Sequence, residues 1–567
     1  MFLRVLVALW LIATPVYAGT LPLLGAGGPP PSSGNLTFTP LHVYYLDPVS
    51  GNDANTCTTV AQACQNMSAS GLSGVVCGDV VLVKSGSWSG GQINQNLPTV
   101  GSCPSTSGGI DGAGGIYFAI LLCAGTDVMS CKYNNGSTGD AFWIDRSNWA
   151  VEGFWATTPI DGSNCFIGNN ANNGGTVQHH VAFINDIAST CGDSGFSTSG
   201  GGTAVGSFDQ TAVVGVAAYN AANSQTHGAE CGSAISIIPA NGPDHSAGTH
   251  VYISGFYLGY NTNTGNPSTV GCNVAGGHSD GEAIILDTWG AGYTSGGYLY
   301  QAVIEQGLAW HSGGSSIQIF PQANAATDDR SQYFISDTTM YAGDQDASGN
   351  GICEADLHLH GISPNSSPTT TSIYDIRNVI VLATVQTCGN LGVNPSFAMN
   401  INPEFTAVLN TAPITITGSY VFNNANGSGG YNTTNSNVFY TDTRSTNSCG
   451  NGTTRCTNFP FGTNTFSDPG LGSITSLWST APDCTGFDNV TTCMLSKYTV
   501  DVFSTPTIAP TTMGYQKPGS CTTKVLSNST NAFPSWLKGI VYLTTSGFVN
   551  SPVITEKTGL ITKPCGV

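Results

Sequence analysis

Residues 316–320 read SIQIF, an alternation of apolar and polar side chains that three other short runs repeat. Those runs are AISII at 234–238, AIILD at 283–287 and DLHLH at 356–360. Longer runs of β-branched and aromatic residues, such as HVYISGFYLGYN at 250–261, recur among them at irregular spacing. Repeated β units of this kind are typical of a solenoid, because one unit buries its apolar side only by stacking on the next. A β-sandwich would space its strands more evenly.

The alternation also predicts which side chains face the interior, because successive residues of a strand face opposite sides. Aligning the runs gives one inward column of Ile235, Ile284, Ile317 and Leu357, and a second of Ile237, Leu286, Ile319 and Leu359. The outward column between them is Ser236, Ile285, Gln318 and His358. The next outward column along the strands is Ile238, Asp287, Phe320 and His360. The preceding outward column is Ala234, Ala283, Ser316 and Asp356. We therefore expect one external face to carry Asp287, Gln318, Asp356, His358 and His360.

The charge balance excludes some classes of function. Only 8% of the 567 residues are charged, with 14 basic against 33 acidic side chains and a net charge of −19. A nucleic-acid binder needs a basic face to displace counterions from phosphates, and no basic cluster occurs in this sequence. The same argument disfavours anionic membrane surfaces. We expect neither a nucleic-acid partner nor membrane insertion, and the sequence leaves the oligomeric state open.

The first 18 residues have the pattern of a secretory signal peptide. Arg4 precedes an apolar stretch at 5–13, and Val16-Tyr17-Ala18 forms a small-residue cleavage site. No later stretch is long and apolar enough to span a bilayer. Residues 19–40 follow as a linker rich in Pro, Gly and Ser. The sequence therefore predicts an extracellular protein.

The cysteines agree with export into an oxidising compartment. All 18 lie after residue 18, and none has the paired CxxC spacing of a zinc site, so disulfides are favoured over a metal. We predict local disulfides at Cys57/Cys64 and Cys449/Cys456, and the close pair Cys484/Cys493 could clip a loop in the same way.

Two groups of motifs carry a resemblance to a known superfamily. VYYLDPVSGNDANTC (43–57) followed by GDVVLVKSGSW (78–88) resembles the N-terminal cap and first rung of bacterial secreted right-handed parallel β-helix proteins of the pectin-lyase-like superfamily. SDGEAIILDTW (279–289) and VIEQGLAWHSGGSSIQIF (303–320) resemble two consecutive rungs of such proteins. The resemblance implies an all-β, right-handed parallel β-helix. It leaves the activity open, because this fold hosts lyases, hydrolases, epimerases and inert fibres.

The resemblance and the repeats together give the expected domain organisation. The parallel β-helix with its N-terminal cap should span residues 41–425. Residues 426–567 should hold the last rungs and a loop-rich, disulfide-containing cap, with WLKGIVYLTT at 536–545 as a terminal strand or cap. Solenoid ends need covering, which is the role we expect for this region.

The candidate catalytic residues come from a clustering of ionisable side chains. Nine of the ten histidines fall between His179 and His360, and HSDGE places His278, Asp280 and Glu282 in alternation. Paired carboxylates about 6.7 Å apart on one side of an extended chain can serve as general acid and base around a glycosidic bond. The candidate catalytic residues are Asp280, Glu282, Asp287, His311, His358 and His360.

Structural roles for the same residues remain open. Asp280 and Gly281 can form a turn, Asp287 can bond a neighbouring rung, and the histidines can be polar surface. Candidate substrate-binding residues are Trp289, Gln318, Arg330 and Asp356. Arg330 follows two aspartates that could bind Ca²⁺ through oxygen ligands, so calcium is the one cofactor that stays open, and no metal ligand is assigned.

The basic residues bear on the type of reaction. No lysine occurs between Lys132 and Lys497, whereas β-helix lyases resemble one another in using Lys or Arg as the base. The paired aspartates, Gly-His-Gly and Arg-Ile-Lys of the polygalacturonase-type hydrolases are also absent. We expect a secreted enzyme that hydrolyses an extracellular polysaccharide with carboxylates as acid and base. The alternatives are a Ca²⁺-dependent polysaccharide lyase and a non-catalytic glycan-binding solenoid.

Overall fold

The computed structural model describes a defined part of the chain, all of it within the unit Asn35–Val567. The described residues are 36–89, 96–101, 103, 117–136, 139–170, 178–199, 208–221, 232–238, 248–259, 281–287, 300–320, 332–341, 343, 355–359, 373–377, 379–383, 397–401, 414–417, 420–423, 439–440, 481–497 and 542–556. Within this part, no helix is long and apolar enough to cross a membrane.

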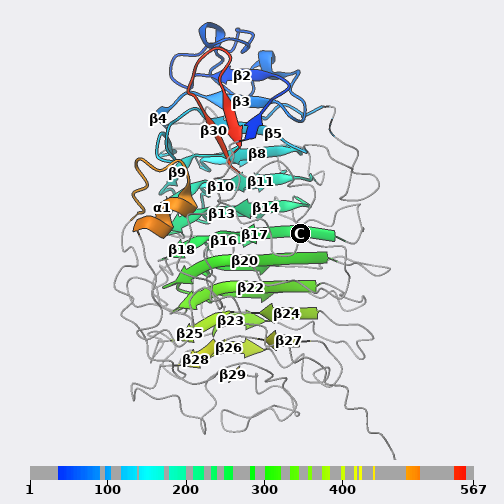
Figure 1. Cartoon of the computed structure of the whole chain (residues 1–567), viewed down its shortest axis with the longest axis vertical. Coiled ribbons are helices and arrows are strands. Elements are labelled where there is room, and N and C mark those ends of the chain that lie inside the picture. Colours follow the sequence, from blue (N-terminus) through cyan, green and yellow to red (C-terminus); the bar gives the residue numbers. More distant parts are fainter. Residues whose placement is uncertain are drawn as a thin grey trace, which may run out of the picture. The chain divides into compact units, whose positions relative to one another are not determined.

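Nearly all regular structure is β, and the strands stack in parallel along three ladders (Figure 1). A nine-stranded sheet contains β7 (Phe142–Ile144), β10 (Phe166–Asn169), β13 (Phe196–Ser199), β16 (Ile235–Ile237), β19 (Ile284–Asp287), β21 (Ile317–Phe320), β23 (Ala355–Leu359), β26 (Phe397–Ile401) and β29 (Phe439–Tyr440). All its pairings are parallel, which agrees with the solenoid that the repeats predict.

Two further ladders complete each rung. The first ladder contains β2 (Val43–Leu46), β3 (Val80–Val83), β5 (Ala119–Cys123), β8 (Trp149–Glu152), β11 (Val181–Ile184), β14 (Thr211–Val214), β17 (Gly248–Ser254), β24 (Ile373–Arg377) and β27 (Ile414–Thr417). The second contains β4 (Gly86–Ser89), β6 (Cys131–Asn134), β9 (Trp155–Thr158), β12 (Ile187–Cys191), β15 (Ala217–Tyr219), β18 (Tyr257–Gly259), β25 (Ile380–Ala383) and β28 (Tyr420–Asn423). The long strands β20 (Tyr300–Trp310) and β22 (Gln332–Tyr341) belong to both. The chain is therefore a parallel β-helix, as the sequence predicts.

The corner between the first and second ladders is a column of residues with left-handed backbone. On successive rungs it contains Gly153 (φ 82°), Asn185 (φ 57°), Gly215 (φ 64°), Gly255 (φ 65°), Gln306 (φ 57°) and Asp337 (φ 52°). Glycine adopts this conformation without steric cost, and asparagine tolerates it better than most residues. One left-handed residue turns the chain sharply enough for two strands to follow one another directly.

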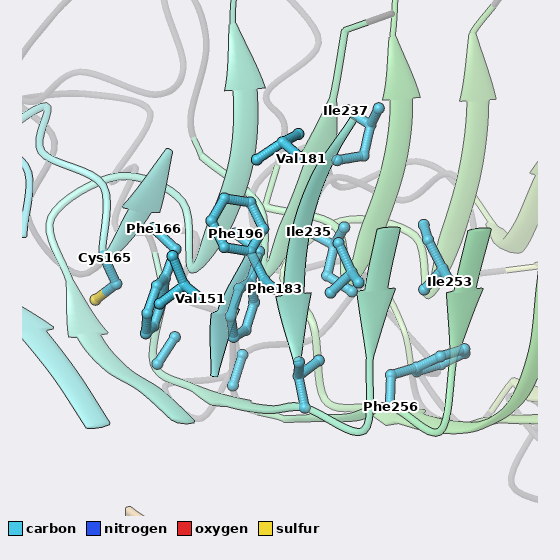
Figure 2. Packing of buried hydrophobic residues seen from close by; sticks show 14 of the residues in the cluster. Val151, Cys165, Phe166, Val181, Phe183, Phe196, Ile235, Ile237, Ile253 and Phe256 are labelled. Atoms are coloured by element: carbon cyan, nitrogen blue, oxygen red, sulfur yellow. The ribbon is translucent and has the colours of Figure 1, made fainter. Parts of the chain in front are cut away.

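The interior is the apolar column predicted from the short runs. Ile235, Ile284, Ile317 and Leu357 pair in register and are fully buried in one core cluster. Further toward the N-terminus, Phe166 stacks on Phe142 and Phe196 with ring centroids 5.0 and 4.9 Å apart. Figure 2 shows Phe166, Phe196 and Ile235 on neighbouring strands with their side chains in the interior. Each such side chain contributes about 1.5–3 kcal/mol on burial.

One predicted outward column is placed wrongly. Ala234 and Ala283 are fully buried members of the core cluster, although the alternation predicts that they face outward. Both residues lie immediately before their strands, at the corner that leads into the nine-stranded sheet. Because the backbone bends there, the strict alternation of an extended strand does not apply.

The first and last described strands pair beside the early rungs. Strand β1 (Leu36–Phe38) pairs antiparallel with β31 (Ile554–Glu556), which pairs with β30 (Leu543–Thr545). The helix α1 (Val490–Lys497) packs on the outer side of the second ladder. Two short 3-10 turns, Val60–Gln62 and Ser70–Leu72, lie between β2 and β3.

Disulfides clip neighbouring segments in the described part of the chain. The predicted Cys57–Cys64 bond is confirmed, Cys484–Cys493 is bonded, and further bonds join Cys77–Cys103, Cys123–Cys131 and Cys165–Cys191. No described cysteine is free. The predicted Cys449/Cys456 pair lies outside the described residues.

Candidate functional site

The outward column of the nine-stranded sheet has the register expected from the sequence. Ser236, Ile285, Gln318 and His358 lie opposite one another on β16, β19, β21 and β23. The Gln318 amide Nε2 lies 3.4 Å from His358 Nδ1 and donates a long hydrogen bond to it. Gln318 and His358 are only 5% and 4% exposed. Along this column the side chain is apolar at Ile285, and the next two rungs carry the hydrogen-bonded polar pair Gln318 and His358.

Asp287 lies on the same sheet, at the last residue of β19. It pairs with Phe320 and follows Leu286, whose side chain is buried in the core. Alternation therefore assigns Asp287 to the same side as Ile285, about 6.7 Å further along the strand. The Asp287 side chain itself lies outside the described part of the structure.

Glu282 belongs to a buried polar chain that runs down the corner before this sheet. Asp140 Oδ1 accepts from Asn164 N at 2.7 Å, and Asn164 Oδ1 accepts from Ser194 N at 3.1 Å. Ser194 Oγ accepts from Ser233 N at 3.2 Å, and Ser233 Oγ donates to Glu282 Oε2 at 2.9 Å. Burial raises the pKa of the Asp140 carboxyl at the start of the chain.

This environment favours a structural role for Glu282. The side chain is buried, and a Cβ placed at Gly314 would lie 2.9 Å from Glu282 Oε1. The backbone is not extended where the sequence alternation needs it, because Gly281 has φ 105° and β19 begins only at Ile284. Glu282 therefore faces the corner and its bonds rather than the outer face of the sheet.

Asp356 is also engaged inside the structure. Its Oδ1 accepts from Ser316 Oγ at 2.9 Å and from Gly343 N at 2.5 Å, and the residue is fully buried. The carboxyl of Asp356 in β23 thereby bonds the residue before β21 and the turn at Gly343. The sequence predicts Asp356 on the external face, and its burial corrects that placement: it precedes the regular alternation of Leu357 and Leu359.

His311 lies at a different corner of the rung. It follows β20 with a left-handed φ of 47°, donates its backbone N–H to Tyr341 O at 3.1 Å and meets the Tyr341 ring edge-on at 5.7 Å. Its ring is partly exposed. These contacts join His311 to Tyr341 at the end of the second ladder.

The remaining sequence candidates lie outside the described residues. They are Asp280, Trp289, Arg330 and His360, and the aspartates before Arg330 lie there as well. Their catalytic, substrate-binding and calcium-binding roles stay predictions. Across the residues that the structure describes, no group of three or more His, Cys, Asp or Glu side chains could hold a metal ion.

Sequence reasoning missed a set of ionisable groups on the outer side of the first ladder. The Tyr252 hydroxyl donates to Glu305 Oε1 at 2.7 Å, and both side chains are fully buried. Burial, and then the charge of Glu305, raise the pKa of Tyr252 well above its usual range. On β24, two rungs beyond Glu305 in the same two columns, Arg377 donates twice to Asp375, at 2.7 and 2.6 Å. The sequence signal for this set is an alignment of the long runs at 250–261 and 301–314, which places Ser254 beside Glu305.

A group of buried histidines lies where strands of the first ladder begin. His250 Nδ1 donates to Asp209 Oδ1 at 2.5 Å, and His180 stacks on Tyr117 with centroids 5.0 Å apart. Burial first, and the neighbouring His179 and His250 second, lower the pKa of His180 well below its usual value. His180 is thus held neutral, as expected for a histidine packed inside the fold.

The chemistry that remains accessible to the outer column is proton transfer. With Nδ1 of His358 accepting from Gln318, the proton of the neutral imidazole resides on Nε2. A ring oriented in this way presents an N–H donor at Nε2. Asp287 lies on β19, which neighbours the strand of Gln318 and is two rungs from the strand of His358.

Comparisons with known proteins give only distant likenesses. No protein-family model matches the sequence, and no curated protein matches it. Among solved structures, a pectate lyase, Pel9A, has a TM-score of 0.35 and 11% identity and covers 68% of this chain and 80% of its own. A rhamnogalacturonan lyase has a TM-score of 0.30 and 15% identity, covering 63% of this chain and 85% of its own. The GH136 lacto-N-biosidase from Eubacterium ramulus has a TM-score of 0.30 and 10% identity, covering 67% of each chain. Likenesses this distant assign no activity to this chain.

Proposed function

We propose that this protein is secreted and hydrolyses an extracellular polysaccharide on the outer face of the nine-stranded sheet. The observation that carries the proposal is the Gln318–His358 hydrogen bond in an outward column, one rung from the strand position of Asp287. Parallel rungs about 4.8 Å apart hold these residues on a rigid frame. A polymer lying across the rungs would cross β19, β21 and β23, the strands of Asp287, Gln318 and His358, in turn. Gln318 and His358 are only 5% and 4% exposed, so contact with them requires the atoms that cover their side chains to move.

Hydrolysis of a glycosidic bond needs one group to protonate the leaving oxygen and another to accept a proton from water. We assign the acceptance of the water proton to the Asp287 carboxylate, and the donation to the leaving oxygen to the Nε2–H of the neutral His358 imidazole. Gln318 would orient the imidazole through Nδ1 and leave the Nε2–H for the leaving oxygen. Asp280 and His360 stay further candidates from the sequence, and the bonds of Glu282 favour a structural role for it instead.

The substrate class and the location follow from composition and disulfides. A strongly acidic chain repels a polyuronate unless a cation intervenes, so a neutral polysaccharide is favoured. The disulfides require an oxidising compartment to form, which agrees with the signal-peptide pattern of the first 18 residues. We therefore propose a neutral extracellular glycan as the substrate.

The test is a panel of neutral and uronate polysaccharides incubated with the full chain, with and without Ca²⁺. New reducing ends report cleavage, and unsaturated uronate reports elimination. Asp287→Asn should lower turnover by about 10²-fold or more, and His358→Gln by a similar factor. The matched control is His42→Gln, which replaces an exposed histidine near the N-terminal cap and should leave turnover unchanged.

Each outcome of the panel decides between reactions. Reducing ends without unsaturated uronate, lost in both site variants, support the proposal. Unsaturated uronate that depends on Ca²⁺ would identify a lyase instead. Binding of a glycan without any cleavage would identify a non-catalytic solenoid, and full activity in both site variants would move the site elsewhere.

A further inference from the structure

The outer side of the early rungs is covered by two C-terminal segments, residues 481–497 and 542–556. The segment with α1 buries Val490 and Met494 against a second-ladder column that contains Ile187, Ala217, Tyr257 and Leu308. The segment with β30 and β31 buries Tyr542, Leu543 and Ile554 against outward apolar residues of the first ladder. Figure 1 shows α1 in orange and β30 in red beside these strands.

Polar contacts fix both segments at the corner between the two ladders. Asn185 Oδ1 accepts from Val490 N at 2.8 Å, and Asn185 Nδ2 donates to Asp488 O at 3.0 Å. On the preceding rung, Glu152 accepts from Leu543 N. The corner residues thus bind backbone groups that lie more than 300 positions away in the chain.

Two further contacts join the segments to each other and to the N-terminal cap. The Tyr542 hydroxyl and the Thr491 hydroxyl lie 3.0 Å apart. At the other end, Tyr45 Oη donates to Val549 O at 3.1 Å, and Asn550 Oδ1 accepts from Val60 N at 2.9 Å. The segments therefore form one connected layer over the early rungs.

Gly215 is the position where this layer approaches the corner most closely. A Cβ placed there would overlap the Tyr542 hydroxyl and lie 2.7 Å from Tyr542 Cζ. Gly255, on the next rung, has nearly the same φ, 65° against 64°. A Cβ at Gly255 would meet only ordinary contacts, at 3.4 Å and beyond. Of these two glycines, only Gly215 is required by the approach of Tyr542.

We infer that residues 481–497 and 542–556 act as a single lateral clasp, seated by Tyr542 over Gly215, that locks the early rungs of the solenoid. A solenoid repeat ordinarily contacts only its neighbours, so the early rungs could otherwise open independently of the C-terminus. The clasp makes their stability conditional on residues at the far end of the chain. Its release exposes the apolar columns that it covers.

The test uses the full chain and a pair of alanine variants. Gly215→Ala and Gly255→Ala carry the same cost of a left-handed non-glycine residue, but only Gly215→Ala displaces Tyr542. Amide hydrogen exchange at Leu543 and Val490 reports clasp opening, because both amides donate to corner side chains. The exchange rates of both amides should be about ten times higher in Gly215→Ala than in Gly255→Ala, because residues in contact are energetically coupled.

A third variant tests whether the clasp acts as one unit and covers the case in which Gly215→Ala does not fold. Tyr542→Ala leaves the corner backbone intact and should speed exchange at Val490 as well as at Leu543. In the Tyr542→Ala background, Gly215→Ala and Gly255→Ala should have equal effects, because the displaced ring is gone. Equal effects in the wild-type background, or faster exchange at Leu543 alone in Tyr542→Ala, would overturn the inference.

Discussion

Replacing Ser233 by alanine removes the last link of the buried polar chain that ends at Glu282. The Ser233 hydroxyl donates to Glu282 Oε2 at 2.9 Å, and both residues are buried. The backbone bonds of Ser233 remain, because Ser194 Oγ and Gly195 N bond its main-chain atoms. The substitution therefore isolates one side-chain hydrogen bond to a buried carboxylate.

The expected cost follows from the burial of the acceptor. A buried oxygen that loses its donor has no bulk water to replace it, which costs about 1–3 kcal/mol. We therefore expect Ser233→Ala to lower the free energy of unfolding by about 1–3 kcal/mol. The control is Ser236→Ala, three residues on in β16, where the side chain is partly exposed on the outer face. Its effect should stay within about 0.5 kcal/mol.

Urea unfolding measures the difference through the midpoint at constant m-value. Hydrogen exchange at Ala234 localises it, because Ala234 N donates to Glu282 O at 3.0 Å. If Ser233→Ala is no more destabilising than Ser236→Ala, the polar chain does not stabilise this corner and the structural role of Glu282 is wrong. Activity on any cleaved glycan should persist in Ser233→Ala.

Three other expectations follow from buried groups. Burial first, and the charge of Glu152 second, raise the pKa of Asp186 well above 3.8, so the folded state keeps a proton that the unfolded chain loses. The free energy of unfolding should then fall as pH rises from about 3.8 through the folded pKa, and urea midpoints should show a shallower fall in Asp186→Asn. Ile317→Ala, in the fully buried inward column, should cost about 2–5 kcal/mol in the same assay, and a cost below about 1 kcal/mol would contradict the register. Cys165 and Cys191 should appear as one linked peptide in a non-reduced digest, and replacing both by alanine should cost about 2–4 kcal/mol.

The sequence predicts the fold well because the core side chains keep a strict alternation. The run SIQIF places Ile317 and Ile319 inward, and a shift by one residue would turn both to the outside. Register is strongly determined wherever one side is buried, so the alternation alone is enough to align Gln318 with His358. The confirmed Cys57–Cys64 bond is predictable for a similar reason, since its partners are only seven residues apart.

The candidate site is harder to predict, because corners do not follow the alternation of strands. The sequence predicts Glu282 on an extended chain with Asp280, but the left-handed Gly281 precedes it and the strand starts at Ile284. The same bend buries Ala283 in the core. Carboxylates at corners bond neighbouring rungs, and composition cannot distinguish them from catalytic groups.

The contacts of the C-terminal segments with the early rungs are not predictable from the sequence. Nothing in the sequence connects Tyr542 with Gly215, or Asn185 with Val490, because contact between such distant positions depends on how the whole chain returns along the rungs. Glu305 escapes prediction for a related reason. It lies in a long apolar run, and only the alignment of that run with the strand of Tyr252 reveals the pair.

The central claim is that a polysaccharide lies on the outer face of the nine-stranded sheet. It is tested most directly by photo-crosslinking an oligosaccharide, taken from a glycan that the protein cleaves, and mapping the modified peptides. The account predicts crosslinks in peptides that contain Ile284–Asp287, Ile317–Phe320 and Ala355–Leu359. Crosslinks confined to the first or second ladder, such as the strand of Glu305, would contradict it.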